Sequence, residues 1–165
     1  MRICHLSYDD VGNPWLGGGG ALRAREIYRR LAARHEITMV CGGYPGAAAE
    51  EEVDGIRVLR TASVRSYAGS RLAYCSAAPG RLRDLSWDVW VNEFSAFAPL
   101  RTPACLRRRG ILFFYHFVGA HALAKHPLVG AVSWAAERLA LQAYSNIVTI
   151  SPSMQEQVRS RLRSR

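Results

Sequence analysis

Lysine is almost absent from this chain of 165 residues. Only Lys125 is a lysine among the 22 basic residues, yet the formal net charge is +9. The arginines are scattered from Arg2 to Arg165 and do not gather in one stripe. Because nucleic-acid-binding proteins usually concentrate their basic residues on one face, this scatter argues against a nucleic acid as partner.

Long apolar runs and closely spaced cysteines are also absent. No run approaches the roughly 18 apolar residues that a membrane-spanning helix needs, and the apolar stretch before Asp9 is too short for a signal peptide. The four cysteines show no C-x-x-C pair and no zinc-ligand spacing. Cys4 and Cys41 fall in strand-like segments, where a thiol usually serves as a small buried hydrophobe. We expect a soluble protein of the reducing cytoplasm.

The common nucleotide-binding and hydrolase motifs are missing as well. Four consecutive glycines are present, Gly17–Gly20, but no register of them completes G-x-G-x-x-G/A, because the last position is Leu22 or Arg23. No Lys-Ser/Thr pair follows the glycines as it would in a P-loop, and no G-x-S-x-G nucleophile elbow occurs. These absences argue against a dinucleotide oxidoreductase, a P-loop NTPase and an α/β-hydrolase.

Strand-like and helix-like segments alternate along the chain. Helical patterns are predicted over 21–36, over 61–85 with a break near 78–80, around Pro99 and Pro103, over 127–144 and from Ser151 onward. The polar segment 44–55 is expected to be a loop, and alternating Arg57 and Arg60 indicate that the third strand is partly exposed. The predicted strands cover 2–8, 36–43, 56–60, 87–93, 111–117 and 146–150.

This alternation predicts one domain of α/β class: a Rossmann-like parallel sheet with helices on both faces. In such sheets ligands bind outside the carboxyl ends of the strands. The glycines of Gly17–Gly20 lead into a helix N-terminus, which is a ready site for an anion. They either let a ligand approach the backbone closely or form a plain connector.

Other candidate residues also follow strands. His116 is either a site residue or a core histidine, and Glu93 is either a site residue or a neighbour of a helix N-cap. Asp9 and Asp10 could bind a metal together with His5 or His116, but this alternative is disfavoured, and no metal site is predicted. The apolar helix 127–144 either packs in the core or borders a lipid-facing acceptor cleft.

The order of these pieces resembles the N-terminal domain of family-4 glycosyltransferases of the GT-B fold. The matching pieces are "MRICHLSYD", the glycine segment leading to "RHEITMVCGG", "VDGIRVLR", "WDVWVNE", the strand before His116 and "NIVTISPSM". The resemblance covers 2–162. It implies a retaining hexosyltransferase that moves a sugar from a nucleotide-sugar donor to an acceptor hydroxyl, with the donor as substrate and no cofactor.

The resemblance also implies roles for single residues. The glycines Gly17, Gly18, Gly19 and Gly20 would lie beside the donor diphosphate and the acceptor, with Arg23 and Glu93 nearby, and His116 would lie near the transferred sugar and act in catalysis. Acceptor specificity would lie in the variable segments 61–85 and 117–127. A peripheral membrane contact would follow if the acceptor is a lipid.

One departure from the family pattern concerns the second domain, which would hold the nucleotide. It is absent from residues 1–165, so we expect this chain to be one half of a GT-B architecture and to be inactive alone. The alternative is a stand-alone Rossmann-like module that binds a phosphorylated small molecule without catalysis.

Overall fold

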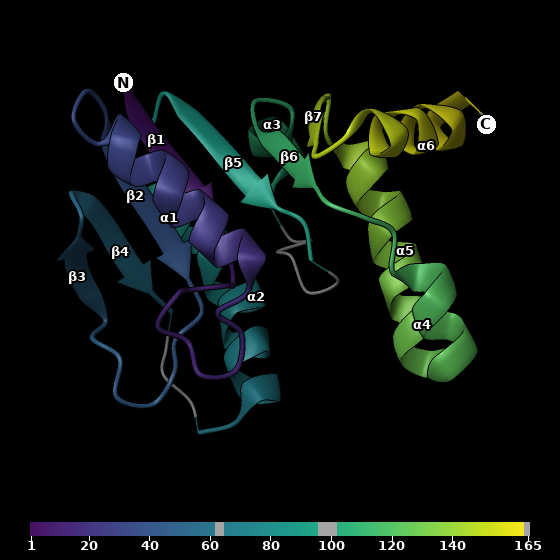
Figure 1. Cartoon of the computed structure of the whole chain (residues 1–165), viewed down its shortest axis with the longest axis horizontal. Coiled ribbons are helices and arrows are strands. Elements are labelled where there is room, and N and C mark those ends of the chain that lie inside the picture. Colours follow the sequence, from purple (N-terminus) through teal and green to yellow (C-terminus); the bar gives the residue numbers. More distant parts are fainter. Residues whose placement is uncertain (62–64, 96–101, 164–165) are drawn as a thin grey trace. The chain divides into compact units, whose positions relative to one another are not determined.

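The computed structural model describes residues 1–61, 65–95 and 102–163. Within these ranges the structure has seven strands in the order β3-β4-β2-β1-β5-β6-β7 and six helices between and after them (Figure 1). The chain forms two compact units, Met1–Val91 and Asn92–Arg165, which are described separately. The strands are β1 Arg2–Leu6, β2 Glu36–Cys41, β3 Glu50–Val53, β4 Ile56–Arg60, β5 Val89–Glu93, β6 Ile111–Phe114 and β7 Asn146–Thr149. The helices are α1 Gly19–Leu31, α2 Tyr67–Asp84, α3 Ala104–Arg107, α4 Gly119–Lys125, α5 Pro127–Ala143 and α6 Pro152–Arg163.

Strand pairing confirms the α/β class. In the first unit β1, β2 and β4 pair in parallel, and in the second unit β6 and β7 do so. A helix lies between β1 and β2, and two helices lie between β6 and β7, as is usual for parallel strands. The chain between β2 and β4 contains the strand β3 and no helix. All six strands expected from the sequence form, within a few residues of their expected bounds.

Side-chain alternation in the first unit places α1 and α2 on opposite faces of the strands (Figure 1). Every second residue of β2, beginning at Ile37, joins a buried cluster with Ala24 and Tyr28 of α1. On the other face, the ring of Tyr8 lies 5.6 Å from that of Tyr74 in α2. Both helices therefore cover core-facing strand residues, as the sequence predicts.

The expectation of a loop over 44–55 is wrong for its second half. Residues Glu50–Val53 form β3, which pairs antiparallel with β4. Asp54 and Gly55 make the two-residue turn, with φ of 55° and 75°, and Asp-Gly is a preferred pair for such hairpin turns. Three glutamates in a row suit an exposed edge strand, where charge discourages further pairing.

The expected helix break near 78–80 is also wrong. Helix α2 continues through Pro79, which lacks the N–H for one helical hydrogen bond. The helix persists because Tyr74, Ala78 and Leu82 on one side of it are buried, the last two completely. Of the two prolines expected to interrupt the next helix, Pro103 directly precedes α3 and Pro99 lies outside the described residues.

In the second unit, α4 and α5 form a helical hairpin that the sequence reading did not include, because 117–127 was taken as a variable segment. Gly130 permits the close approach: a Cβ there would lie 2.1 Å from backbone atoms of Leu123. The buried carboxylate of Glu137 accepts a hydrogen bond from the N–H of Val118 at 2.6 Å, at the start of α4. A carboxylate is favourable at this positive end of a helix.

Arg60 ties three segments of the first unit together. Its side chain is 3% exposed, although the sequence suggested partial exposure for this strand. Nε donates to Asp10 Oδ2 at 2.6 Å, one terminal nitrogen donates to the carbonyl oxygen of Ala48 at 3.1 Å, and the other donates to Glu51. Burial alone lowers the pKa of Arg60, but the hydrogen bonds to the two carboxylates outweigh it and raise that pKa above its ordinary value.

We predict that Arg60→Met lowers the free energy of unfolding by about 3 kcal/mol, because it leaves the largely buried Asp10 carboxylate without its counter-charge. Arg57→Met on the same strand is the matched control. Arg57 pairs with Glu50 while both side chains are at least half exposed, so its loss should cost less than about 1 kcal/mol. Urea denaturation followed by circular dichroism measures both values. Equal losses would contradict a special role for Arg60.

Candidate functional site

The loop after β1 is folded by its own polar side chains. Asp10 accepts the N–H of Gly12 at 3.1 Å through its carboxylate and the N–H of Asn13 at 2.9 Å through its carbonyl. The Asn13 side-chain oxygen in turn accepts the N–H of Trp15 at 2.9 Å. Such Asx turns fix a loop without regular secondary structure. Since Arg60 holds the Asp10 carboxylate, the path toward Gly17 is anchored to the sheet.

The four glycines do not share one structural reason. A Cβ at Gly17 would lie 3.0 Å from the carbonyl oxygen of Val11, so packing within the loop accounts for this glycine. Gly18 and Gly19 have nothing within 4 Å of such a Cβ, and neither has a positive φ. The chain itself therefore does not require glycine at these two positions.

The start of α1 is open and carries no acidic side chain. Gly18 is the N-cap, with no side-chain cap, and no acidic residue lies in the first turn. Gly19 is exposed, while Gly20 and Arg23 are half-buried. The first N–H groups of a helix lack intrahelical partners and carry partial positive charge. This helix end is therefore suited to a ligand anion.

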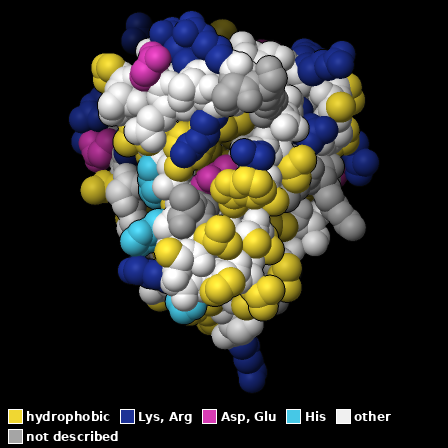
Figure 2. Space-filling model, turned by 90° about the vertical axis from the view of Figure 1, so that its right-hand side faces the viewer, with side chains coloured by type: hydrophobic (Ala, Val, Ile, Leu, Met, Phe, Trp, Pro, Cys, Tyr) yellow, Lys and Arg dark blue, Asp and Glu magenta, His cyan; other side chains and the backbone are white. Residues whose placement is uncertain are grey.

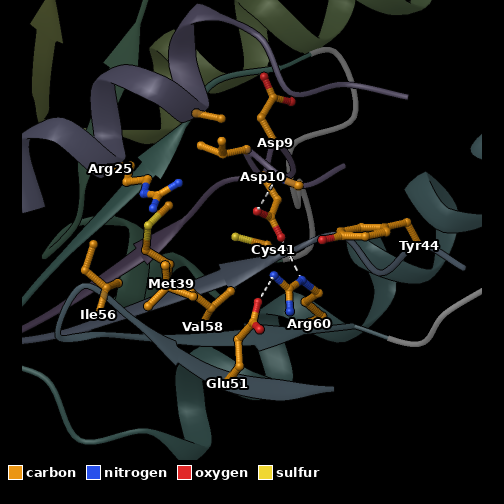
Figure 3. A pocket seen from close by; sticks show the side chains of 14 residues that line it. Asp9, Asp10, Arg25, Met39, Cys41, Tyr44, Glu51, Ile56, Val58 and Arg60 are labelled. Carbon is orange, nitrogen blue, oxygen red and sulfur yellow. Dashed lines mark hydrogen bonds and ion pairs between the residues drawn. The ribbon is translucent and has the colours of Figure 1, made fainter. Parts of the chain in front are cut away.

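A cavity of about 190 Å³ lies in the first unit beside this loop (Figure 3). Its apolar wall comes from β2, β4 and α1, and charged side chains of Asp9, Asp10, Arg25 and Glu51 stand around it. Asp10 and Val11 line the cavity, and their carbonyl oxygens would lie 3.3 and 3.0 Å from a Cβ at Gly17, so the cavity and the glycine segment share a wall. The full lining is Asp9, Asp10, Val11, Gly12, Ala21, Arg25, Met39, Cys41, Tyr44, Glu51, Val53, Ile56, Val58 and Arg60.

Sequence reasoning missed this cavity and the role of Arg60. The only available signal was the position of Arg60 at the carboxyl end of a strand, and its alternation with Arg57 was interpreted as exposure. Tyr44 was likewise assigned to a polar loop, whereas its ring lies 5.2 Å from the Arg60 guanidinium carbon.

In the second unit, Glu93 is the last residue of β5, and His116 lies two residues after the end of β6. Glu93 is 8% exposed and accepts a hydrogen bond from the hydroxyl of Tyr115. The N–H of Phe94 donates to the carbonyl oxygen of Phe113 at 2.9 Å, which holds the two strand ends together. His116, one residue after Tyr115, is exposed.

The exposure of His116 shows that it is not a core histidine. The buried histidine of the chain's first strand is His5, at 2% exposure, whose ring meets that of Tyr28 edge-on at 5.3 Å. Asp10, considered as a metal ligand, is engaged by Arg60. Among the described residues no three His, Cys, Asp or Glu side chains gather as a metal site would require.

The structure thus brings the predicted residues together in two groups. The first unit joins Asp10, the glycine segment Gly17–Gly20 and the start of α1. In the second unit, Glu93 binds Tyr115, the residue directly before His116. The convergence of both groups on one ligand, which the strand-end rule suggests, stays a prediction.

Comparisons with known proteins bear on the fold and the family of this chain. The sequence matches the family model "Glycosyltransferase Family 4" over residues 17–165. Among solved structures, sucrose-phosphate synthase from Thermosynechococcus elongatus superposes with a TM-score of 0.69 at 13% sequence identity. That match covers 97% of this chain and 45% of the other, so this chain spans less than half of that protein. No curated protein sequence matches.

The structural match supports the Rossmann-like fold, and the sequence match gives the family. The sequence match extends over nearly all of the chain, from the first of the four glycines through the hairpin of α4 and α5 to the last helix. The chain belongs to Glycosyltransferase Family 4.

Proposed function

We propose that this chain is the N-terminal domain of a retaining hexosyltransferase, which moves a sugar from a nucleotide-sugar donor to an acceptor hydroxyl in the cytoplasm. The observation that carries the proposal is the open start of α1, where Gly18 and Gly19 have no neighbour within 4 Å of a Cβ position and no acid occupies the first turn. A second domain, outside residues 1–165, holds the donor nucleotide. The donor is consumed as a substrate, and no cofactor takes part.

Charge develops at two places during such a transfer. The leaving nucleoside diphosphate gains negative charge, and the N–H groups at the start of α1, with Arg23 in its first turns, are suited to stabilise it. The sugar carbon gains oxocarbenium-like positive character. His116, exposed next to Tyr115, is the residue that we assign to this sugar, and Glu93 helps to position that strand end by binding Tyr115.

We predict that Gly18→Val and Gly19→Val abolish turnover or raise KM, because the added side chains would occupy the space of the ligand. Gly80→Val in α2 is the matched control, since its Cβ position is equally open. All three variants should fold, which thermal unfolding checks. Steady-state kinetics of the whole enzyme with UDP-glucose or GDP-mannose measures the effect. Unchanged kinetics would mean that the segment is only a connector.

His116→Ala should lower kcat of the whole enzyme by about 100-fold, the scale of losing one transition-state contact. The fold should stay intact because the side chain is exposed. Arg159→Ala, at an exposed position of α6 in the same unit, serves as control and should leave kcat unchanged. Near wild-type turnover in His116→Ala would remove this residue from the proposed site.

The 165-residue chain alone should be catalytically silent, because donor and acceptor must be held together in near-attack geometry. Calorimetry with UDP-glucose and GDP-mannose should show no micromolar binding, and chromatography should show no released sugar. Micromolar binding without turnover would favour the alternative, a stand-alone module for a phosphorylated small molecule. Turnover by the chain would contradict the need for a second domain.

A further inference from the structure

Large apolar side chains lie exposed on the outer side of α5. The exposed fractions are 85% for Leu128, 56% for Val132, 44% for Trp134 and 53% for Leu139. Figure 2, which views the side of the molecule that carries this helix in Figure 1, shows hydrophobic side chains gathered across this side. The expectation that 127–144 packs its apolar face in the core is therefore wrong. This surface is open, so it does not define the size or shape of a ligand.

The cavity of the first unit, in contrast, has walls that define what fits. Met39 and Cys41 of β2 and Ile56 and Val58 of β4 form its apolar wall (Figure 3), and each of them is less than a tenth exposed. The volume of about 190 Å³ exceeds the roughly 150 Å³ that is sufficient for benzene in an apolar cavity. Because protein interiors leave few voids larger than one water molecule, a space of this size is suited to a ring-sized ligand.

A small residue of α1 leaves this space open. Ala21 is 1% exposed and lines the cavity, so a longer side chain at this position would extend into it. Alanine and leucine are both strong helix formers. The helix therefore does not itself require alanine here.

The buried charges beside the cavity neutralise one another. Arg60 donates hydrogen bonds to the carboxylates of Asp10 and Glu51. These three side chains come from three segments of the first unit, and their mutual bonds already occupy the charged groups nearest to the sheet wall. A ligand cation or anion at this wall would compete with an ion pair that is already made.

The charged groups farther along the lining give the same answer. Nε of Arg25 donates to Asp54 Oδ2 at 2.9 Å, so this guanidinium has its own carboxylate. The carboxylate of Asp9 points away from the apolar wall (Figure 3). A charged ligand would thus be buried without a dedicated counter-charge, which is costly, whereas an uncharged ligand carries no such cost.

We propose that this cavity binds a small uncharged ring compound with one hydroxyl group, of the class of aromatic alcohols. The ring lies against Met39 and Val58, and the hydroxyl accepts a hydrogen bond from the guanidinium of Arg25, which reaches over the apolar wall in Figure 3. The lining residues include none of those assigned above to sugar transfer. The inference goes beyond the proposed function, and either can fail without the other.

Methionine-methyl NMR of the 165-residue chain tests the proposal with benzyl alcohol as the probe. The chain has three methionines, of which Met39 lines the cavity, Met1 is 63% exposed and Met154 belongs to the second unit. The ring should shift the Met39 signal and leave the other two in place. We expect a Kd on the order of 1 mM or tighter, which is reasonable for a ligand of this size.

Two further probes separate charge from shape. Benzoate and benzylamine carry the same ring, but at pH 7 the first is an anion and the second a cation. Each should bind at least about tenfold more weakly than benzyl alcohol, because neither finds a dedicated counter-charge.

A pair of variants tests the location. Ala21→Leu should weaken the binding of benzyl alcohol by at least about tenfold, because the added side chain takes up apolar surface that the ring would bury. Ala33→Leu adds the same side chain at an exposed position after α1 and should bind as the wild type does. Circular dichroism checks that both variants fold.

Several outcomes would overturn the inference. They are a Met39 signal that none of the three probes moves, equal shifts of all three methionine signals, binding of either charged probe as tight as that of benzyl alcohol, and wild-type binding by a folded Ala21→Leu. The comparison of the three probes needs no variant, so it decides the question even if Ala21→Leu does not fold.

Discussion

The candidate site of the first unit depends on the hydrogen bonds that the buried guanidinium of Arg60 makes. Arg60 leaves the end of β4 and binds the side chains of Asp10 and Glu51 and the carbonyl oxygen of Ala48. Each partner comes from a different segment, so one side chain fixes the loop after β1 and the edge strand against the sheet. An arginine suits this role because its planar fork offers several donors in fixed directions.

The rigid loop after β1 therefore leads directly into the open start of α1. The loop up to Gly17 is crowded and hydrogen-bonded, and Gly17 itself is enclosed by backbone oxygens. One residue later the chain is open, and α1 begins with bare N–H groups and no acidic side chain. A ligand at this helix end would meet donors that are already held in place, which lowers the reorganisation needed on binding.

The sequence predicts the helices and strands that depend on a local residue pattern. It predicts less well the features that tertiary contacts determine. Parallel strands with helices between them follow from alternation, but the hairpin turn at Asp54 and Gly55 was overlooked because the strand before it carries three glutamates. Pro79 was interpreted as a break, although burial on one side of α2 overrides it. The burial of Arg60 could not be predicted, since its partners lie 50 and 9 positions away in the chain.

The contact between Gly130 and the backbone of Leu123 has a consequence for how this protein can change. The hairpin is joined through main-chain atoms and small residues, so its cohesion does not draw on the large outward side chains. Substitutions on that outer surface should leave the free energy of unfolding nearly untouched, while any side chain at Gly130 would force the two helices apart. Folding and surface chemistry are thus carried by separate sets of positions, and the surface can be redesigned for a chosen target without repacking the interior.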